Sequence, residues 1–303
     1  MEKIFVFILL FISSAIHGQF TCFENKEHPL PSFSDEAKKN LEAKLAVAKS
    51  DFDYDSTNAD NIIWLGRRTA YLGDYKKAIE IFTLGIKLHP QDARLYRHRG
   101  HRFITLRCFD KAIADFRKAA AIMKGKPDEA EPDGLPNAKN IPTSTLQSNI
   151  WYHLGLAYFI KGEYKKALEA YEECVKVSDN PDMYVATANW LHLTLRRLKK
   201  NKEADELLKT ISSEMNLIEN TDYYEIILLY KRDTDFADPL AYLENEKAGL
   251  GLASFGFGLG CYLLFKGDKE NARKIFERIC NTDQWSSFGY VASEAELKRL
   301  SKK

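Results

Sequence analysis

A repeat with a period of 34 residues constrains the fold of this chain more than any other feature of its sequence. Three pairs of identical residues have that spacing: Gly66 and Gly100, Ala78 and Ala112, and Phe82 and Phe116. Self-similarity at a fixed period of about 20 to 50 residues is typical of arrays in which one small unit is stacked repeatedly. Each unit here contains an apolar stripe at helical spacing, a Gly-Asp or Gly-Glu turn, and a second stripe. The pattern predicts stacked pairs of antiparallel helices.

The segment that begins at Trp151 carries the pattern in its fullest form. It has the sequence W-x2-L-G-x2-Y, followed by Ala167 and then Tyr171. This resembles the tetratricopeptide repeat pattern W-x2-L-G-x2-Y…A-x3-F almost letter for letter. The chain is similar to tetratricopeptide repeat proteins, and among them to uncharacterised exported bacterial ones. The resemblance implies an all-α solenoid of stacked helix pairs with helical caps and a concave groove that binds proteins or peptides.

The repeat pattern also predicts how the chain is divided. The predicted parts are an N-terminal segment with a capping helix at 19–58, units one and two at 59–124, units three and four at 148–216, an irregular helical pair at 217–249, and the last unit with a C-terminal capping helix at 250–303. Unit four is degenerate, because Ala204 lies 37 residues after Ala167 and His192 stands where a helix-contact glycine belongs. Its helices are still expected, at about 183–199 and 202–215.

The first 18 residues are typical of a secretory signal peptide. Met1, Glu2 and Lys3 are followed by a nearly uninterrupted apolar run over 4–12 and then by small residues. The run is about half the roughly 20 residues that a membrane helix needs. Cleavage is expected after Ala15 or Gly18, and we expect no later stretch to be apolar enough to span a bilayer. We therefore expect an exported protein of the bacterial periplasm or another extracytoplasmic space.

Five cysteines follow the predicted signal peptide: Cys22, Cys108, Cys174, Cys261 and Cys280. The number is odd, the spacing is long and no C-x-x-C pair exists, so the pattern favours neither zinc ligation nor a redox centre. We expect them mainly to be small apolar residues packed in helices, in a compartment that permits disulfides. Lipidation of Cys22 is an alternative, although the residues just before it match lipoprotein processing poorly.

Composition and motifs argue against catalysis. The chain is 45% apolar and 29% charged, with a formal net charge of +1, so its total charge does not favour nucleic acid or an anionic membrane. The stretch from Asp51 to Asp55 resembles a calcium loop, but Ser56 replaces the turn glycine and Ile62 the last carboxylate. No phosphate loop or hydrolase motif is present. We expect no enzyme activity, cofactor or metal.

An insertion at 125–147 separates units two and three. It extends the 34-residue period by about 21 residues and contains a turn at Asp133-Gly134 and four prolines: Pro127, Pro132, Pro136 and Pro142. Loops of this length are usually functional or disordered. Its first half is acidic and contrasts with the basic stretch at 94–102 just upstream. The sequence leaves open whether this insertion is a passive tether or a functional element.

The basic stretch and its equivalents predict a binding groove. In similar proteins, the groove is lined by the first helix of each unit, at places six and three residues before the inner glycine and one after it. Those places predict a partner-binding surface that changes from cationic at the front to aromatic at the back: Arg67, Arg94, Arg97, His101, Tyr152 and Phe257. The alternative is a solvated helix face that pairs with nearby carboxylates such as Asp115. Arg99 occupies an apolar place and must find a carboxylate.

These features predict a scaffold or adaptor that holds an extended peptide or a partner protein in its groove. A cationic front and an apolar back suit a partner with an acidic portion and an apolar anchor. The alternative, from another class, is an accessory subunit of an extracytoplasmic enzyme or envelope-assembly complex. Neither hypothesis involves nucleic acid or a membrane span after removal of the signal peptide.

Overall fold

The computed structural model of the chain describes residues 22–24, 26–233 and 235–302. In this part of the chain there are fourteen α-helices and no strand, apart from one isolated antiparallel bridge between Ala130 and Thr145. The predicted signal peptide at 1–18 lies outside the described residues. The all-α prediction is confirmed for the part that the structure describes.

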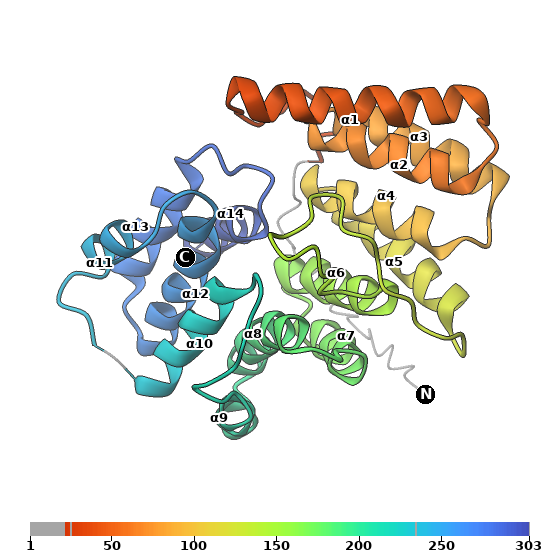
Figure 1. Cartoon of the computed structure of the whole chain (residues 1–303). Coiled ribbons are helices and arrows are strands. Elements are labelled where there is room, and N and C mark those ends of the chain that lie inside the picture. Colours follow the sequence, from red (N-terminus) through yellow and green to blue (C-terminus); the bar gives the residue numbers. More distant parts are fainter. Residues whose placement is uncertain (1–21, 25, 234, 303) are drawn as a thin grey trace, which may run out of the picture.

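The helices form a curved array of pairs (Figure 1). In chain order they are α1 (Asp35–Tyr54), α2 (Ala59–Tyr71), α3 (Tyr75–Leu88), α4 (Ala93–Thr105), α5 (Phe109–Met123), α6 (Leu146–Lys161), α7 (Tyr164–Lys176), α8 (Pro181–Arg197), α9 (Asn201–Lys209), α10 (Thr221–Arg232), α11 (Pro239–Glu246), α12 (Gly249–Lys266), α13 (Lys269–Cys280) and α14 (Phe288–Leu300). Figure 1 shows the pairs α2/α3 to α8/α9 following one another along an arc, with α10–α14 on the opposite side.

A glycine in each regular unit lets its two helices approach. The helix-contact glycines each face an aromatic ring sixteen residues later: Gly66 faces Phe82, Gly100 faces Phe116, Gly155 faces Tyr171 and Gly260 faces Phe276. A Cβ at Gly155 would lie 2.6 Å from a ring carbon of Tyr171, far inside normal contact distance. These pairs confirm the repeat register and the packing role of the glycines.

Unit four departs from this register. His192 takes the place of the glycine, and its ring stacks on Tyr230 of α10 with centroids 4.8 Å apart. The second helix, α9, ends at Lys209 rather than near 215. The chain turns there because the Thr210 hydroxyl donates to the carbonyl of Leu207 at 2.7 Å. Side-chain bonds of this kind compete with continuation of a helix.

Both ends of the array carry a capping helix. At the front, the Ser34 hydroxyl accepts from the backbone N–H of Ala37 at 3.2 Å and caps the start of α1. Helix α1 buries Leu41 and Ala48 against the rest of the array. At the back, α14 begins at Phe288, within the predicted C-terminal part of the chain. Such caps cover the apolar face that a terminal unit would otherwise expose.

The C-terminal helices fold back onto the front of the array. Arg107, in the turn between α4 and α5, donates to the Trp285 carbonyl and to Glu294, both at 2.8 Å. Glu296 of α14 pairs with Arg197 of α8 at 2.7 Å, and Arg299 donates to the carbonyl of Ile160 in α6. One hydrophobic core therefore runs from α2 to α14.

Two of the five cysteines differ from the prediction. Cys22 and Cys108 form a disulfide across 86 residues, which fastens the segment before α1 to the turn between α4 and α5. The prediction of packed apolar residues was therefore wrong for this pair, because sequence spacing does not show which distant cysteines become neighbours in the fold. Cys174 and Cys261 are buried as predicted, and Cys280 is partly buried. The Cys22 sulfur is committed to the disulfide, which contradicts the lipidation alternative.

Helix α12 corrects a further expectation. It has 18 residues with a mean hydropathy of 1.3, and it is long and apolar enough to cross a membrane by length and composition. The fold buries 61% of these residues, because α12 packs against α8, α10, α13 and α14. A helix that is apolar on all sides is expected at the centre of a core as well as in a bilayer.

Candidate functional site

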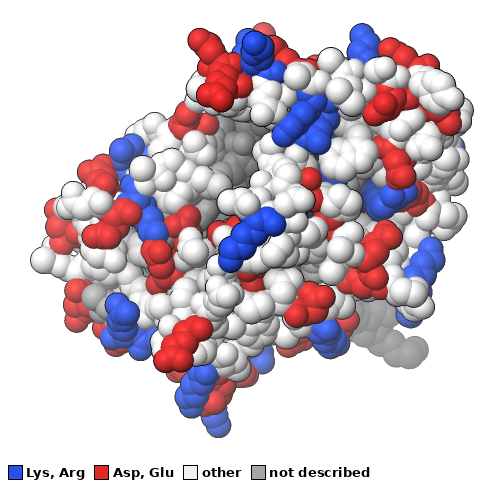
Figure 2. Space-filling model, viewed as in Figure 1, with Lys and Arg blue, Asp and Glu red and all other residues white. Residues whose placement is uncertain are grey.

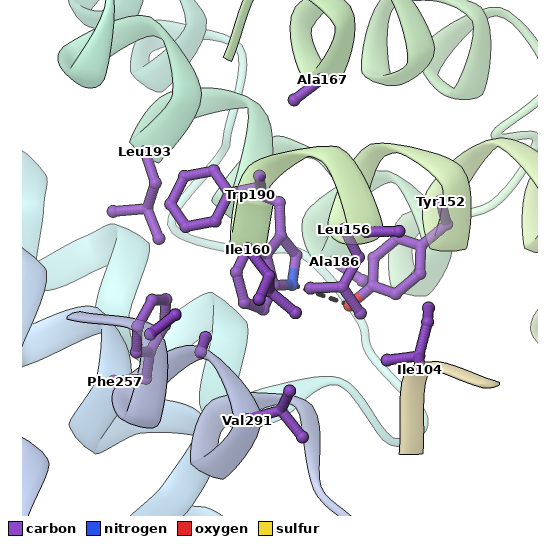
Figure 3. Packing of buried hydrophobic residues seen from close by; sticks show 14 of the residues in the cluster. Ile104, Tyr152, Leu156, Ile160, Ala167, Ala186, Trp190, Leu193, Phe257 and Val291 are labelled. Carbon is purple, nitrogen blue, oxygen red and sulfur yellow. Dashed lines mark hydrogen bonds between the residues drawn. The ribbon is translucent and has the colours of Figure 1, made fainter. Parts of the chain in front are cut away.

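The six predicted groove residues lie on the inner helices α2, α4, α6 and α12, but the structure divides them into two groups. The back pair, Tyr152 and Phe257, lies in the core. Phe257 is 1% exposed, with its ring centroid 5.3 Å from that of Trp190 and 5.8 Å from that of Phe276. The Tyr152 hydroxyl accepts from Trp190 Nε1 at 2.8 Å (Figure 3). Neither side chain is available to a partner in this structure.

His101 also faces the core rather than an open groove. Its ring centroid lies 4.6 Å from that of His153 in α6 and 5.3 Å from that of Phe288 in α14. Burial and the nearby Arg102 lower the pKa of His101 well below its usual value, so the ring is neutral at pH 7. The predicted groove places do face inward, but α14 fills the space in front of them.

Arg94 lies on the exposed rim of the front. Its guanidinium contacts Asp60 and Asp92, each at 2.6 Å, and 37% of its side chain is exposed. These carboxylates raise the pKa of Arg94 above its usual value. Arg99, which occupies an apolar place in the repeat, pairs with Asp115 at 2.7 Å, as its position predicts. At Arg94 and Arg99 the structure therefore shows pairing with nearby carboxylates, which was the alternative to a binding groove.

The remaining front arginines contact the insertion at 125–147. Arg67 donates to the Pro132 carbonyl at 2.7 Å, and Arg68 donates to the Gly134 carbonyl at 2.5 Å. Arg97 lies 2.9 Å from Oε2 of Glu131. We call residues 131–134 the acidic turn, and we define the cationic face as the set Arg67, Arg68, Arg97 and Arg102. Figure 1 shows the insertion crossing in front of α4 and α6.

The contact between turn and face excludes water. Arg67, Arg97 and Glu131 are each 8% exposed. Asn149 of α6 also donates to Oε2 of Glu131, at 3.2 Å. Gly134 is needed at its position, because a Cβ there would collide with the Tyr71 hydroxyl. The acidic turn is therefore fitted to α2, α4 and α6 by both charge and shape.

Positive charge on this face is only partly neutralised. Arg102 has no ion-pair partner among the described residues and lies with its guanidinium 5.7 Å from the ring centroid of Tyr75. Burial lowers the pKa of Arg102 to about 10. Burial likewise lowers the pKa of Arg97, and burial together with Arg97 lowers that of His98 well below its usual value. The site thus favours additional negative charge.

The insertion is anchored at its base by polar contacts. The Glu131 N–H donates to the Ser144 carbonyl at 3.0 Å, and the Thr145 hydroxyl donates to Asp128 at 2.6 Å. Its large apolar side chains, Leu135 and Ile141, remain exposed. The docked insertion is therefore stabilised by ion pairs and hydrogen bonds rather than by burial of its own apolar residues.

Sequence reasoning assigned no role to Arg68, Arg102 or Glu131. The signal that could have found them is the contrast between the acidic half of the insertion and the basic stretch before it, because opposite charges in a compact fold tend to meet. On the face shown in Figure 2, acidic and basic side chains are intermingled rather than gathered into one broad basic patch.

One group of potential metal ligands exists among the described residues. Ligand atoms of Cys22, Glu24 and Cys108 lie within 4.8 Å of one another. Both sulfurs are joined in the disulfide, so neither is a thiolate that could bind a metal. We infer no metal site from this group.

Consecutive helix pairs, each set by a glycine against an aromatic ring, define an α-solenoid of two-helix repeats. The family model of the tetratricopeptide repeat matches residues 148–181. That is the segment with the fullest sequence pattern, and its neighbours have the same two-helix architecture. Residues 148–181 therefore form a tetratricopeptide repeat, and they lie within an array of helix pairs of the same architecture. Solenoids of this kind present extended concave surfaces that bind other molecules.

Comparison with known proteins gives weaker similarities. The chain is 28% identical over 137 residues to the BBSome complex member BBS4 of Bos taurus, which is 45% of this chain and 22% of that protein. The chain thus matches less than a quarter of the length of this curated relative.

Among solved structures, MamA from Desulfovibrio magneticus RS-1 is 18% identical, with 66% of this chain and 90% of that chain covered and a TM-score of 0.45. YrrB, described as a TPR protein with an unusual peptide-binding site, is 13% identical, with coverage of 82% and 97% and a TM-score of 0.44. Similarity at this level says nothing of a shared ligand.

Proposed function

We propose that this protein is a scaffold that holds an acidic segment of a partner protein on its cationic face. The observation that carries the proposal is the pair of buried arginines Arg67 and Arg97, which contact one turn of chain through a carbonyl and a carboxylate oxygen. Arg102 lies beside Tyr75 on the same face and has no ion-pair partner among the described residues. Buried arginines are costly unless they are paired, so a cluster with an incomplete set of partners favours binding of further carboxylates. The proposal gives the chain no catalytic step.

The test begins with affinity capture from native extracts of the host and identification of stoichiometric partners by mass spectrometry. Affinity for the captured partner is then measured by calorimetry with Arg68→Ala and Arg102→Ala, two arginines of the cationic face that are only partly buried. Lys165→Ala and Lys166→Ala on α7 are the matched controls. We expect a loss of roughly tenfold or more for the arginine variants, because a shielded charge-assisted contact contributes about 1.5 to 3 kcal/mol.

Equal, small losses from both pairs of variants would contradict binding at the front. A captured partner that binds with unchanged affinity when its acidic residues are neutralised would contradict it as well. The aromatic places at Tyr152 and Phe257 are not offered as an alternative surface, because both side chains lie in the core.

A second candidate function is that of an accessory subunit in a larger complex. The resemblance to a protein named as a BBSome complex member favours it, since that relative works within an assembly. Copurification of this chain with an enzyme or envelope-assembly complex at fixed stoichiometry would support this role. Capture of a free peptide-bearing partner without such a complex would count against it.

We also propose that the chain is exported and loses its first residues. The disulfide between Cys22 and Cys108 supports this proposal, because disulfides persist mainly in oxidising compartments. Amino-terminal analysis of protein from the native host is expected to find Ile16 or Gln19 first. Intact Met1 on protein from the cytosol would overturn the proposal.

A further inference from the structure

The acidic turn sits on the cationic face in the way a bound peptide would. Its carboxylate and two carbonyl oxygens face three arginines on two successive inner helices. We propose that the acidic turn is an internal ligand that closes the cationic face, and that an acidic segment of a partner protein binds by displacing it. This inference rests on the proposed function, since it names how that binding site is regulated and what it recognises.

The contacts of the turn define the recognition chemistry. The first contact along the turn is made by the Glu131 carboxylate, which lies between Arg97 and the Asn149 amide. Its Oε1 lies 3.8 Å from His98 Nε2. The next carbonyl meets Arg67, and the carbonyl two residues later meets Arg68. A partner segment that satisfies the same donors needs an acidic residue followed by a tight turn with outward carbonyls, as in the sequence Glu-Pro-Asp-Gly at 131–134.

The internal turn does not use the face fully. Asp133 Oδ2 is buried and has no hydrogen-bond partner among the described residues. Burial raises the pKa of Asp133, which marks a carboxylate that is not well compensated where it lies. In the part of the chain that the structure describes, no carboxylate forms an ion pair with Arg102. A partner that places a second carboxylate against Arg102 would make an ion pair that the internal turn does not make.

A partner can displace the acidic turn because the turn is held on the cationic face mainly by polar contacts. Leu135 and Ile141 are already exposed, so lifting the turn does not expose large apolar side chains of the insertion. Each polar contact is replaced by water at a modest net free-energy change. The tether, however, keeps the turn at an effective concentration in the millimolar range, so a free peptide competes poorly with it. In the closed state the cationic face keeps its intrinsic affinity for an acidic peptide, but competition from the tethered turn lowers the affinity that is measured.

The probe for this inference is a fluorescent peptide with the chain's own sequence at 128–136, DEAEPDGLP, and its binding to the full chain is followed by anisotropy. Two variants release the turn by different means. Glu131→Gln with Asp133→Asn removes its charges, and Gly134→Ala forces it away from Tyr71. The control, Glu129→Gln with Glu172→Gln, removes two exposed carboxylates that do not contact the cationic face.

We expect both release variants to bind the peptide at least about tenfold more tightly than wild type and the control to match wild type, because an internal competitor has been removed. Hydrogen exchange at the Glu131 amide, which donates to Ser144 in the closed state, should become faster in both variants. A peptide with Gln and Asn in place of its second Glu and second Asp should not bind.

Equal peptide affinity in wild type and in variants with fast exchange would overturn the internal-ligand proposal. So would unchanged exchange in both variants, because the turn would then not be held by these contacts. Either result leaves the proposed scaffold function to its own test, in which Arg68→Ala and Arg102→Ala are measured against the captured partner. Loss of partner binding there, without peptide binding here, would show that the face binds partners but is not closed by the turn.

Discussion

The front of the inner face is lined by arginines on α2 and α4, whereas the back is lined by aromatic rings on α6, α8 and α12. The lining residues occupy equivalent positions of the repeat in the two regions, and in both regions another segment of the chain packs over them. At the front the cover is a loop fastened by ion pairs and carbonyl bonds. At the back it is α12 and α14, whose side chains are part of the core. Inward-facing arginines are thus contacted by a polar loop, whereas inward-facing aromatic rings are packed by helices.

This difference has an energetic consequence. Burial of a large aromatic side chain contributes a few kcal/mol that water cannot replace. An exchanged polar contact contributes a net of about 0.5 to 1.5 kcal/mol, because water bonds to the same groups after opening. The back cover is therefore expected to be permanent and the front cover to be exchangeable.

The largest effect is expected from Phe257→Ala in the back cover. The ring lies between Trp190 and Phe276, and its removal leaves a cavity where α12 meets α8 and α13. Deletions of this kind cost about 3 to 5 kcal/mol. Chemical denaturation gives the free energy of unfolding, and Tyr54→Ala at an exposed tyrosine is the control. A loss below about 1 kcal/mol would mean that the back rings are not a fixed core.

The next effect is expected from Gly155→Leu, which tests the register that front and back share. The new side chain would enter the space of the Tyr171 ring, and overpacking of a core costs about 1 to 3 kcal/mol. Lys165→Leu adds the same side chain on an exposed face of the next helix. We expect faster hydrogen exchange in neighbouring units as well, because the stability of each unit depends on its packing against the next. A melting temperature within about a degree of wild type would contradict the register.

The sequence was sufficient for the parts of the fold that depend on nearby residues. The glycine and ring of each unit are sixteen residues apart, and Ser34 lies next to the helix it caps, so their patterns are visible in the chain. The early end of α9 was missed, because a local Thr210 bond stops the helix inside an otherwise helical pattern.

Contacts between distant segments could not be predicted in the same way. Arg107 meets Glu294 across 187 residues, and that closure places α14 over Tyr152 and His101. An open groove was expected by analogy with similar proteins, but Tyr152 and Phe257 lie in the core and Arg94 lies on the exposed rim. What covers the predicted groove depends on the curvature of the whole array, which no local pattern encodes.

An intermediate effect is expected from pH, acting at the boundary between front and back. Burial and the nearby Arg97 and Arg102 lower the pKa of His153 well below its usual value. The unfolded chain takes up a proton near pH 6.5, whereas the folded chain does not, so stability falls as the pH drops below about 6.5. The contribution of this residue is up to about 1.4 kcal/mol per pH unit.

The measurement is the free energy of unfolding of wild type and His153→Gln at pH 6.5 and 5.5. We expect the variant to lose less stability on acidification than wild type does. An identical slope for wild type and His153→Gln would show that His153 is not held neutral by its surroundings.

The smallest effect is expected at the rim of the front, where Arg94 pairs with Asp60 in contact with solvent. Exposed ion pairs contribute about 0.2 to 1 kcal/mol, and salt near 1 M shortens the screening length to about 3 Å. A double-mutant cycle with Arg94→Ala and Asp60→Asn should therefore give a coupling energy below about 1 kcal/mol that disappears in high salt. The same cycle with Arg97→Ala and Glu131→Gln reports the covered pair, where water is excluded and screening is weaker. We expect that second coupling to be larger and to persist in salt. If the two couplings are equal and equally sensitive to salt, the acidic turn does not shield the cationic face, and the front is an open surface rather than a closed one.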